Sequence, residues 1–332
     1  MEPERDGGRL PVFADVLAAA ARIAPHATVT PVLRSRNLDA LAGCELLFKA
    51  EPLQRAGAFK FRGACNAVWA LDDDAARRGV VTHSSGNHGA ALALAAGTRG
   101  IACHVVVPEG AVEAKLAAIR AYGATLHRCA PTIAAREAAC AQVQSDTGAT
   151  LVHPYADPAV IAGQGTAALE LLASGNGDPL DAVVVPVGGG GLASGTCLSV
   201  AARSPGTRVV LAEPSGAAET AASLAAGSRV TDFEPDTVCD GLRGTLGAPN
   251  FTLLQAHGVD VVTVDDAATL AAMRLVWQRL KLVVEPSSAI ALAAVLAEPG
   301  RFAGQRVGMI LSGGNVDLDA LPALFAQARR GD

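Results

Sequence analysis

The chain has 332 residues, of which 50% are hydrophobic and 18% are charged, a composition typical of folded globular proteins that excludes a disordered chain. This length exceeds the size at which one hydrophobic core usually stays undivided, so two domains are expected. The formal net charge is −5 and no basic cluster exceeds a pair of residues, so nucleic acid is not an expected partner.

Several features indicate a cytoplasmic protein. No segment approaches the roughly 18 uninterrupted apolar residues of a membrane helix, so no membrane is expected as a partner. The N-terminal stretch MEPERDGGRL is polar and acidic, unlike a signal peptide. The seven cysteines are odd in number and lack a C-x-x-C spacing, which argues against a disulfide framework or a zinc site.

Short apolar runs typical of β-strands alternate with alanine-rich runs of helical spacing. The expected strands are Glu45–Lys49, Gly79–Thr82, Cys103–Val107, Ala124–Arg128, Ala182–Val187, Arg208–Ala212, Val259–Val264 and Arg306–Leu311. The expected helices are Gly89–Ala96, Val112–Ala121, Thr132–Ser145, Ala159–Ala173, Leu192–Arg203, Ala267–Leu280 and Ser287–Ala297. This alternation predicts parallel α/β sheets, whose ligand sites lie in loops at the carboxyl ends of strands.

Three polar, glycine-rich loops follow predicted strands: HSSGNHG at 83–89, GGGG at 188–191 and SGGNVD at 312–317. Four consecutive glycines let the backbone approach a ligand closely and direct several N–H groups at it. The helix that starts near Leu192 adds its positive N-terminal dipole, so the tetraglycine loop is a candidate phosphate site. Alternatively, it is only a tight turn. The Walker and dinucleotide fingerprints are both absent.

Lys60 is one of four lysines in the chain and lies in the stretch AFKFRGA. An amine that forms a Schiff base must be neutral part of the time, which requires burial or a cationic neighbour. Phe59, Phe61 and Arg62 provide both kinds of surroundings. With a phosphate site, such a lysine points to pyridoxal phosphate (PLP). Alternatively, Lys60 is a lysine at a helix start whose stem lies along apolar surface.

The other two loops also have two interpretations. The backbone N–H groups of HSSGNHG could hold a carboxylate, or Ser84, Ser85 or Asn87 could cap the following helix. His88 could equally be a packing residue. Ser312, at the end of a buried strand, could hydrogen-bond a ligand nitrogen or cap the turn.

Four motifs together resemble a known family. AFKFRGA resembles the Schiff-base lysine motif of the fold-type II PLP enzymes, and HSSGNHG resembles their substrate-carboxylate loop. VPVGGGGLASG resembles their phosphate loop, and LSGGNVD their pyridine-nitrogen strand. The motifs occur in the family's order, and the resemblance covers roughly Thr28 to Leu324. Within the family, HPYADPAVIAGQGTAALE and VEPSSAIALAAVL resemble the serine racemases and the short serine/threonine dehydratases.

The resemblance implies a fold like that of the tryptophan synthase β subunit, with two three-layer α/β/α domains and mostly parallel sheets. Residues 1–78 and 156–332 would form a large PLP-binding domain. Residues 79–155 would form a small domain that closes over the substrate. A homodimer is implied as well.

The resemblance also implies roles for individual residues. Lys60 would bind PLP covalently and act as a base at the substrate Cα, and Ser85 would act on the opposite face. The implied cofactor-binding residues are Phe59, Lys60, Asn87, Gly188, Gly189, Gly190, Gly191, Leu192 and Ser312. The implied substrate-binding residues are Ser84, Ser85, Asn87, His88 and Arg136.

The segment Glu213–Glu219 resembles the family's divalent-cation loop, in which two carboxylates and a carbonyl hold Mg²⁺ or Ca²⁺. The ligands here would be Glu213, Glu219 and the carbonyl of Ala217. Alternatively, this is a surface loop with two solvated acids.

Two positions depart from the racemase pattern: Tyr155 replaces an asparagine, as is more typical of dehydratases, and Gly244 replaces a serine.

The predicted function is therefore that of a PLP-dependent ammonia-lyase that converts a β-hydroxy amino acid to a 2-oxo acid and ammonia. The candidate substrates are L-serine, L-threonine and 3-hydroxyaspartate. One alternative is a serine racemase with β-elimination as a side reaction. Two others are a β-replacement enzyme and a non-enzymatic amino-acid sensor.

Overall fold

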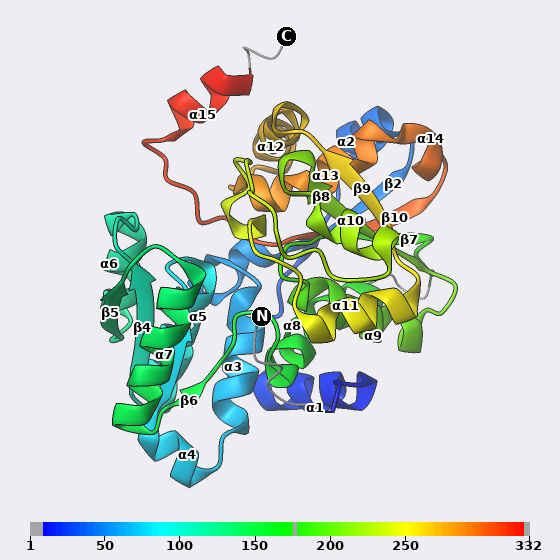
Figure 1. Ribbon diagram of the computed structural model, residues 1–332. Helices are drawn as coiled ribbons and strands as arrows, with labels where there is room; N and C mark the ends of the chain where they lie inside the picture. Colours follow the sequence, from blue (N-terminus) through cyan, green and yellow to red (C-terminus); the bar gives the residue numbers. More distant parts are fainter. Residues whose placement is uncertain (1–8, 175–177, 329–332) are drawn as a thin grey trace.

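The computed structural model describes residues 9–174 and 178–328. Two mostly parallel β-sheets, each covered by helices, make up the molecule (Figure 1), so the predicted α/β class is confirmed. Residues 1–8, which carry most of the argument against a signal peptide, lie outside the described range. Within that range no helix is long and apolar enough to cross a membrane.

The first sheet has six strands in the order β1-β2-β10-β7-β8-β9. Their bounds are β1 (Val32–Leu33), β2 (Glu45–Ala50), β7 (Ala182–Pro186), β8 (Arg208–Pro214), β9 (Asp260–Val264) and β10 (Arg306–Leu311). Of these six, only β1 pairs antiparallel. The sheet lies between α13 (Pro286–Ala297) on one face and α8 (Pro158–Ala173) with α9 (Gly191–Arg203) on the other. Because both faces are covered, every residue of β7 is buried.

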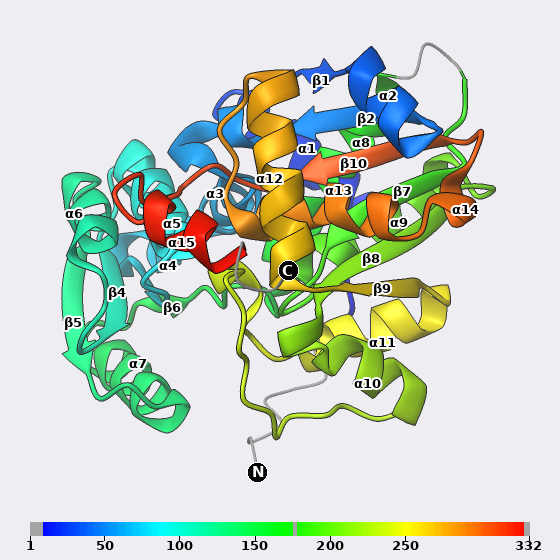
Figure 2. The ribbon, with the colours of Figure 1, turned by 90° about the horizontal axis from the view of Figure 1, so that it is seen from above.

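The second sheet has four parallel strands in the order β5-β4-β3-β6. Their bounds are β3 (Val80–His83), β4 (Cys103–Pro108), β5 (Thr125–Cys129) and β6 (Thr150–Leu151). Helices α5 (Asn87–Arg99) and α6 (Glu113–Ala121) cover one face, and α7 (Ile133–Thr147) covers the other (Figure 2). All four strands come from the segment assigned to the small domain, whose boundaries remain a prediction.

Helix α3 (Lys60–Ala70) joins the two sheets, because it packs on α8 of the first and on α5 of the second. Glycines allow the close approach to α8. A β-carbon at Gly63 would lie 2.4 Å from Nε2 of Gln164, and one at Gly163 would lie 2.6 Å from the Cα of Gly63. The start of α3, where Lys60 lies, is therefore held at the junction of the two sheets.

All predicted strands and helices are present, with ends that differ by a few residues. The strands β1 and β6 were not predicted, because two residues are too short to show an alternating pattern. The remaining helices are α1 (Phe13–Ile23), α2 (Arg36–Ala42), α4 (Asp73–Arg78), α10 (Glu219–Ala226), α11 (Ala248–His257), α12 (Asp266–Leu280), α14 (Pro299–Phe302) and α15 (Leu321–Ala328). Short 3₁₀ turns complete the described fold: η1 (Glu51–Leu53), η2 (Arg55–Gly57), η3 (Ser215–Ala217) and η4 (Asp240–Leu242).

A buried cluster of four charges fixes the start of α3. The Arg62 guanidinium is fully buried, and its Nε donates to Glu51 Oε2 at 2.7 Å. Its Nη1 donates to Glu170 Oε1 at 2.6 Å, and Lys49 Nζ donates to the other oxygen of Glu170 at 2.5 Å. The two positive and two negative side chains give the cluster a formal net charge of zero. Four elements, β2, η1, α3 and α8, are thereby joined by charge-assisted hydrogen bonds.

We expect Arg62→Met to lower the free energy of unfolding by about 3–5 kcal/mol, because it leaves the buried Glu51 carboxylate without its cation. Urea denaturation followed by circular dichroism measures this change. Arg77→Ala is the control, because Arg77 pairs with Asp74 on the surface and such pairs contribute little. An Arg62→Met protein as stable as this control would contradict the role of the cluster.

Candidate active site

The three glycine-rich loops meet at the junction of the sheets. The tetraglycine loop follows β7 and the SGGNVD loop follows β10, and these strands are neighbours in the first sheet. HSSGNHG instead follows β3 of the second sheet. The loops thus leave the carboxyl ends of strands, as predicted, but from two sheets that face each other across α3 (Figure 1).

The Lys60 amine lies inside this junction. Its Nζ donates a hydrogen bond to the carbonyl of Pro154 at 2.9 Å and lies 5.1 Å from the centre of the Phe59 ring. Burial lowers the pKa of Lys60 to about 8, although the nearby Glu285 charge acts in the opposite direction. Lys60 therefore loses its proton much closer to neutral pH than an ordinary lysine, as a nucleophilic amine requires.

Glu285 is a site residue that the sequence argument did not identify. Its carboxylate is buried, and Oε1 accepts a hydrogen bond from Asn87 Nδ2 at 2.8 Å. Burial raises the pKa of Glu285 to about 8, and the Asp240 charge adds to the effect. The Asn87 oxygen accepts from Asn315 Nδ2 at 2.9 Å. The only signal in the sequence was an acidic residue in the motif VEPSSAI.

The tetraglycine loop has free backbone donors. Within the described residues, no protein acceptor outside helix α9 takes a hydrogen bond from the backbone N–H groups of this loop, Gly188–Gly191. Leu192 lies in the first turn of α9, so its N–H also belongs to the unpaired donors of a helix start. Gly190 has a φ of 90°, which a residue with a side chain rarely adopts. This array fits a phosphate group.

Ser312 and Phe59 lie beside the lysine. Ser312 is buried, its Oγ lies 3.4 Å from the carbonyl oxygen of Ser287, and its own carbonyl accepts from the Phe59 N–H at 2.9 Å. The group at the end of β10 is thus a neutral hydroxyl. It fits a pyridine nitrogen that is not held protonated by a carboxylate.

The HSSGNHG loop lies at the start of α5. Ser84 and Ser85 precede the helix, Asn87 is its first residue, and the Ser84 hydroxyl accepts weakly from the Gly86 N–H at 3.4 Å. His88 is buried, with Nε2 3.2 Å from the carbonyl oxygen of Val152. Burial and the Lys60 charge hold the pKa of His88 well below its usual value. His88 is therefore neutral.

Arg136 lies on α7, which covers the second sheet. Its Nε is buried and has no hydrogen-bond partner among the described residues. Burial lowers the pKa of His83, at the end of β3, and the Arg136 charge lowers it further. A guanidinium with an unused buried donor thus lies near the start of the HSSGNHG loop, where it could take a carboxylate.

The predicted cation loop brings two buried carboxylates together. Glu213 is the next-to-last residue of β8 and accepts from the N–H groups of Thr220 at 2.7 Å and Ala221 at 2.9 Å. Glu219 starts α10 and accepts from the Leu246 N–H at 2.7 Å. Burial and then the Glu213 charge raise the pKa of Glu219 to about 7. Two buried like charges beside the 3₁₀ turn of Ala217 fit a divalent cation.

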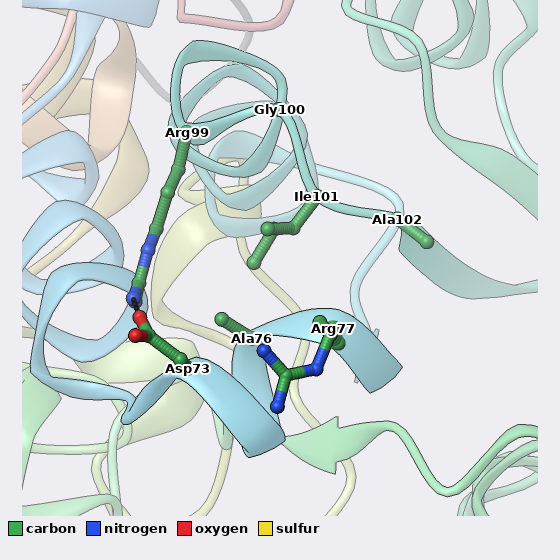
Figure 3. A pocket seen from close by; sticks show the side chains of 7 residues that line it. All are labelled: Asp73, Ala76, Arg77, Arg99, Gly100, Ile101 and Ala102. Carbon is green, nitrogen blue, oxygen red and sulfur yellow. Dashed lines mark ion pairs between the residues drawn. The ribbon is translucent and has the colours of Figure 1, made fainter.

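A separate hollow of about 410 Å³ lies away from these groups, where α4 approaches the end of α5 (Figure 3). Figure 3 shows Arg99 directed at Asp73, and their charged atoms are 3.8 Å apart. None of the candidate site residues lines this hollow. The candidate active site is therefore the junction of the sheets.

The fold and the site define a class of enzyme. A parallel α/β fold with a buried amine, a phosphate-sized array of backbone donors and a neutral hydroxyl beside them is the arrangement of a PLP enzyme. The family model "Pyridoxal-phosphate dependent enzyme" matches residues 23–313. The chain belongs to this family.

Known relatives narrow the class. The chain is 49% identical to the β-hydroxyaspartate dehydratase of Paracoccus denitrificans over 94% of this chain and 99% of the relative. The solved structure of maize serine racemase superposes with a TM-score of 0.90 at 42% identity, covering 97% of this chain and 98% of that one. The solved serine racemase of Dictyostelium discoideum gives 0.88 at 45% identity, covering 93% and 99%. A solved threonine deaminase gives the same TM-score at 44% identity. The chain is thus a member of the PLP-dependent dehydratase and racemase group.

We expect the rate of PLP capture by the apo-protein to rise with pH through about 8, because only the neutral Lys60 amine attacks the aldehyde. Stopped-flow absorbance between pH 6.5 and 10 gives the midpoint. Lys60→Ala should show no covalent capture, whereas Lys281→Ala, which removes an exposed lysine, should behave as wild type. A midpoint near 10.5, the ordinary lysine value, would contradict the lowered pKa.

Proposed function

We propose that the protein is a PLP-dependent ammonia-lyase acting on 3-hydroxyaspartate. The β-hydroxyl leaves as water, and the released enamine then takes up one water and yields a 2-oxo acid and ammonia. L-Serine and L-threonine are the other candidate substrates. The observation that carries the proposal is the buried Lys60 amine, with a pKa of about 8, opposite the free donors of the tetraglycine loop. The 49% identity to a β-hydroxyaspartate dehydratase supports the choice of substrate.

The chain's own residues divide the work as follows. When bound, PLP supplies an electron sink for charge that develops at the substrate Cα. Lys60 takes the Cα proton, for which its lowered pKa suits it. Gly188–Gly191 would hold the phosphate, and Asn87, oriented by Glu285, would hydrogen-bond the ring oxygen. Ser312 would offer the ring nitrogen a neutral hydroxyl in place of an acid, which would favour prompt loss of a β-hydroxyl over transamination.

An acidic substrate suits the charged groups near the HSSGNHG loop. The loop lies at the N-terminus of α5, where backbone N–H groups and the helix dipole favour one carboxylate. The unpaired Nε of Arg136 supplies a cationic donor for a carboxylate as well. Ser84, Asn87 and His88 border the same place. A substrate with two carboxylates could use both groups.

We expect release of ammonium and a 2-oxo acid from a stereoisomer of 3-hydroxyaspartate, with a kcat/KM at least about tenfold above that for L-serine or L-threonine. A panel of all stereoisomers, assayed for ammonium and 2-oxo acid, measures this. Arg136→Gln should reduce kcat/KM for 3-hydroxyaspartate more than for serine, because only the former has a second carboxylate. Holoenzyme that releases ammonium from none of these substrates would overturn the proposal.

The second candidate function is serine racemisation, which Ser85 and the racemase relatives support. Racemisation needs proton transfer on both faces of Cα, whereas elimination needs only the Lys60 face. Chiral chromatography of serine after incubation separates the two reactions, and Ser85→Ala should abolish any D-serine while ammonium release continues. Absence of D-serine with the wild-type enzyme removes this candidate.

A divalent cation, Mg²⁺ or Ca²⁺, is proposed at Glu213, Glu219 and the carbonyl of Ala217. We expect either ion to raise the melting temperature of the wild type, because an ion that binds only the folded state stabilises it by about 2.7 kcal/mol at a hundred times its Kd. Chelation should reverse the shift. Glu219→Gln should remove most of it and Glu113→Gln, on the surface, should not. An equal shift in Glu219→Gln would contradict the site.

We also propose that the protein is a cytoplasmic homodimer and that its small domain closes over the substrate. Val29, Leu53 and Val283 are 77%, 50% and 46% exposed, and they lie on adjoining segments, which supports an interface with a second copy. An ion pair between Lys115 of α6 and Asp240 of η4 joins the two sheet units, which supports closure of the small domain.

All seven cysteines are free thiols, which suits a reducing compartment.

A further inference from the structure

Tyr155 occupies a slot lined by glycines of two different loops. A β-carbon added at Gly189 would lie 2.3 Å from the ring Cγ, and one at Gly191 would lie 3.2 Å from the Tyr155 Cβ. In the second loop, a β-carbon at Gly247 would lie 3.2 Å from Cδ2, and one at Gly244 would lie 3.7 Å from Cε1. The ring therefore packs against glycines of both the tetraglycine loop and the 240–247 segment, and a side chain at Gly189 would displace it.

Hydrogen bonds hold the same three segments together. The Asn250 amide nitrogen donates to the Tyr155 carbonyl at 2.9 Å and also to the Gly189 carbonyl. The Gly247 N–H donates to that same Gly189 carbonyl at 3.2 Å. Both acceptors are carbonyls, so these bonds brace the loop without using its N–H groups. The donors that fit a phosphate stay available.

The same segment also holds the reactive lysine. The residue before Tyr155 is Pro154, whose carbonyl accepts the hydrogen bond from Lys60 Nζ. The ring of His153 stands edge-on to Tyr155, with centroids 4.5 Å apart. Two consecutive residues, Pro154 and Tyr155, thus contact the two groups that are proposed to bind the aldehyde end and the phosphate end of the cofactor. Tyr155 contacts the phosphate loop and Pro154 contacts the amine.

Packing in an apolar core does not account for this ring. Tyr155 is partly exposed and belongs to none of the hydrophobic clusters formed by the described residues, whereas Tyr122, the other tyrosine, packs against one of them. Gly189, Gly244, Gly247 and the ring of His153 are among the neighbours of the Tyr155 ring. The contact is thus directed at the backbone of the tetraglycine loop.

We propose that Tyr155 is a positioning residue that sets the shape of the phosphate site and its distance from Lys60. This inference rests on the proposed role of the tetraglycine loop in binding the PLP phosphate. The ring acts as a rigid spacer, because an aromatic side chain has few rotatable bonds to readjust. Without the ring, the loop is free to move into the vacated slot and its N–H groups lose their common direction.

The test compares the binding of PLP and of pyridoxal, which lacks the phosphate, to the apo-protein. Both carry the aldehyde that reacts with Lys60, so the ratio of the two affinities reports on the phosphate site. Tyr155→Ala should weaken PLP binding by about tenfold or more and pyridoxal binding by less than about threefold. Tyr155→Phe, which keeps the ring, should retain the wild-type ratio, as should the control Tyr122→Ala.

A double-mutant cycle with Gly189→Ala tests the contact itself. In the wild type the added methyl group meets the ring, whereas in Tyr155→Ala the slot is empty. The loss of PLP affinity caused by Gly189→Ala should therefore be at least about threefold smaller in the Tyr155→Ala background. If Tyr155→Ala does not fold, Tyr155→Leu replaces it in both experiments, with an intermediate change in the affinity ratio.

Three outcomes would overturn the inference. Equal losses for PLP and pyridoxal in Tyr155→Ala would mean that the ring only stabilises the fold. Additive effects in the cycle would mean that ring and loop are not coupled. A Tyr155→Phe protein as impaired as Tyr155→Ala would assign the effect to the hydroxyl. A wild type that binds PLP no better than pyridoxal would instead overturn the proposed role of the tetraglycine loop, and this inference with it.

Discussion

The buried charge cluster around Arg62 is the constraint on which the site depends. Arg62 lies two residues after Lys60 in α3, and its guanidinium is held by carboxylates of Glu51 and Glu170 from two other elements. A buried charge is tolerated only when it is paired, so the orientation of α3 about its own axis is restricted. The same orientation directs Lys60 toward Pro154. The ion pairs of Arg62 thus fix the position of the Lys60 amine, although Arg62 itself takes no part in the chemistry.

Low polarity around the site then sets its chemistry. Burial moves the pKa of Lys60 downward and that of Glu285 upward, both to about 8. Near neutral pH the Glu285 carboxyl is therefore mostly uncharged, and a minor fraction of the Lys60 amine is neutral. His88 is neutral and Ser312 is a hydroxyl. These surroundings favour proton transfer by the amine, and a pyridine nitrogen placed at Ser312 would have no acid partner. A site of this kind suits elimination from a β-hydroxy amino acid.

The contacts that assemble the site cross from one sheet unit to the other. Asn87 of α5 reaches Glu285, and Lys115 of α6 pairs with Asp240. Asp240 also contributes to the raised pKa of Glu285, so the surface pair and the buried site are linked electrostatically. Movement of the second sheet would therefore alter the charge and the hydrogen bonds around the cofactor position together. This arrangement is suited to a reaction that must exclude water.

The sequence by itself determined the α/β class, most strands, about half of the described helices, and the motifs around Lys60, Gly188–Gly191 and Ser312. Each of these is a local pattern of period, glycine content or order along the chain. Only the tertiary structure decided that Glu285 adjoins Asn87 and that Tyr155 fills a slot between two glycine-rich segments. These contacts join residues far apart in the chain. They depend on strand order, helix packing and the space that absent side chains leave, and none of these produces a periodic signal in the sequence.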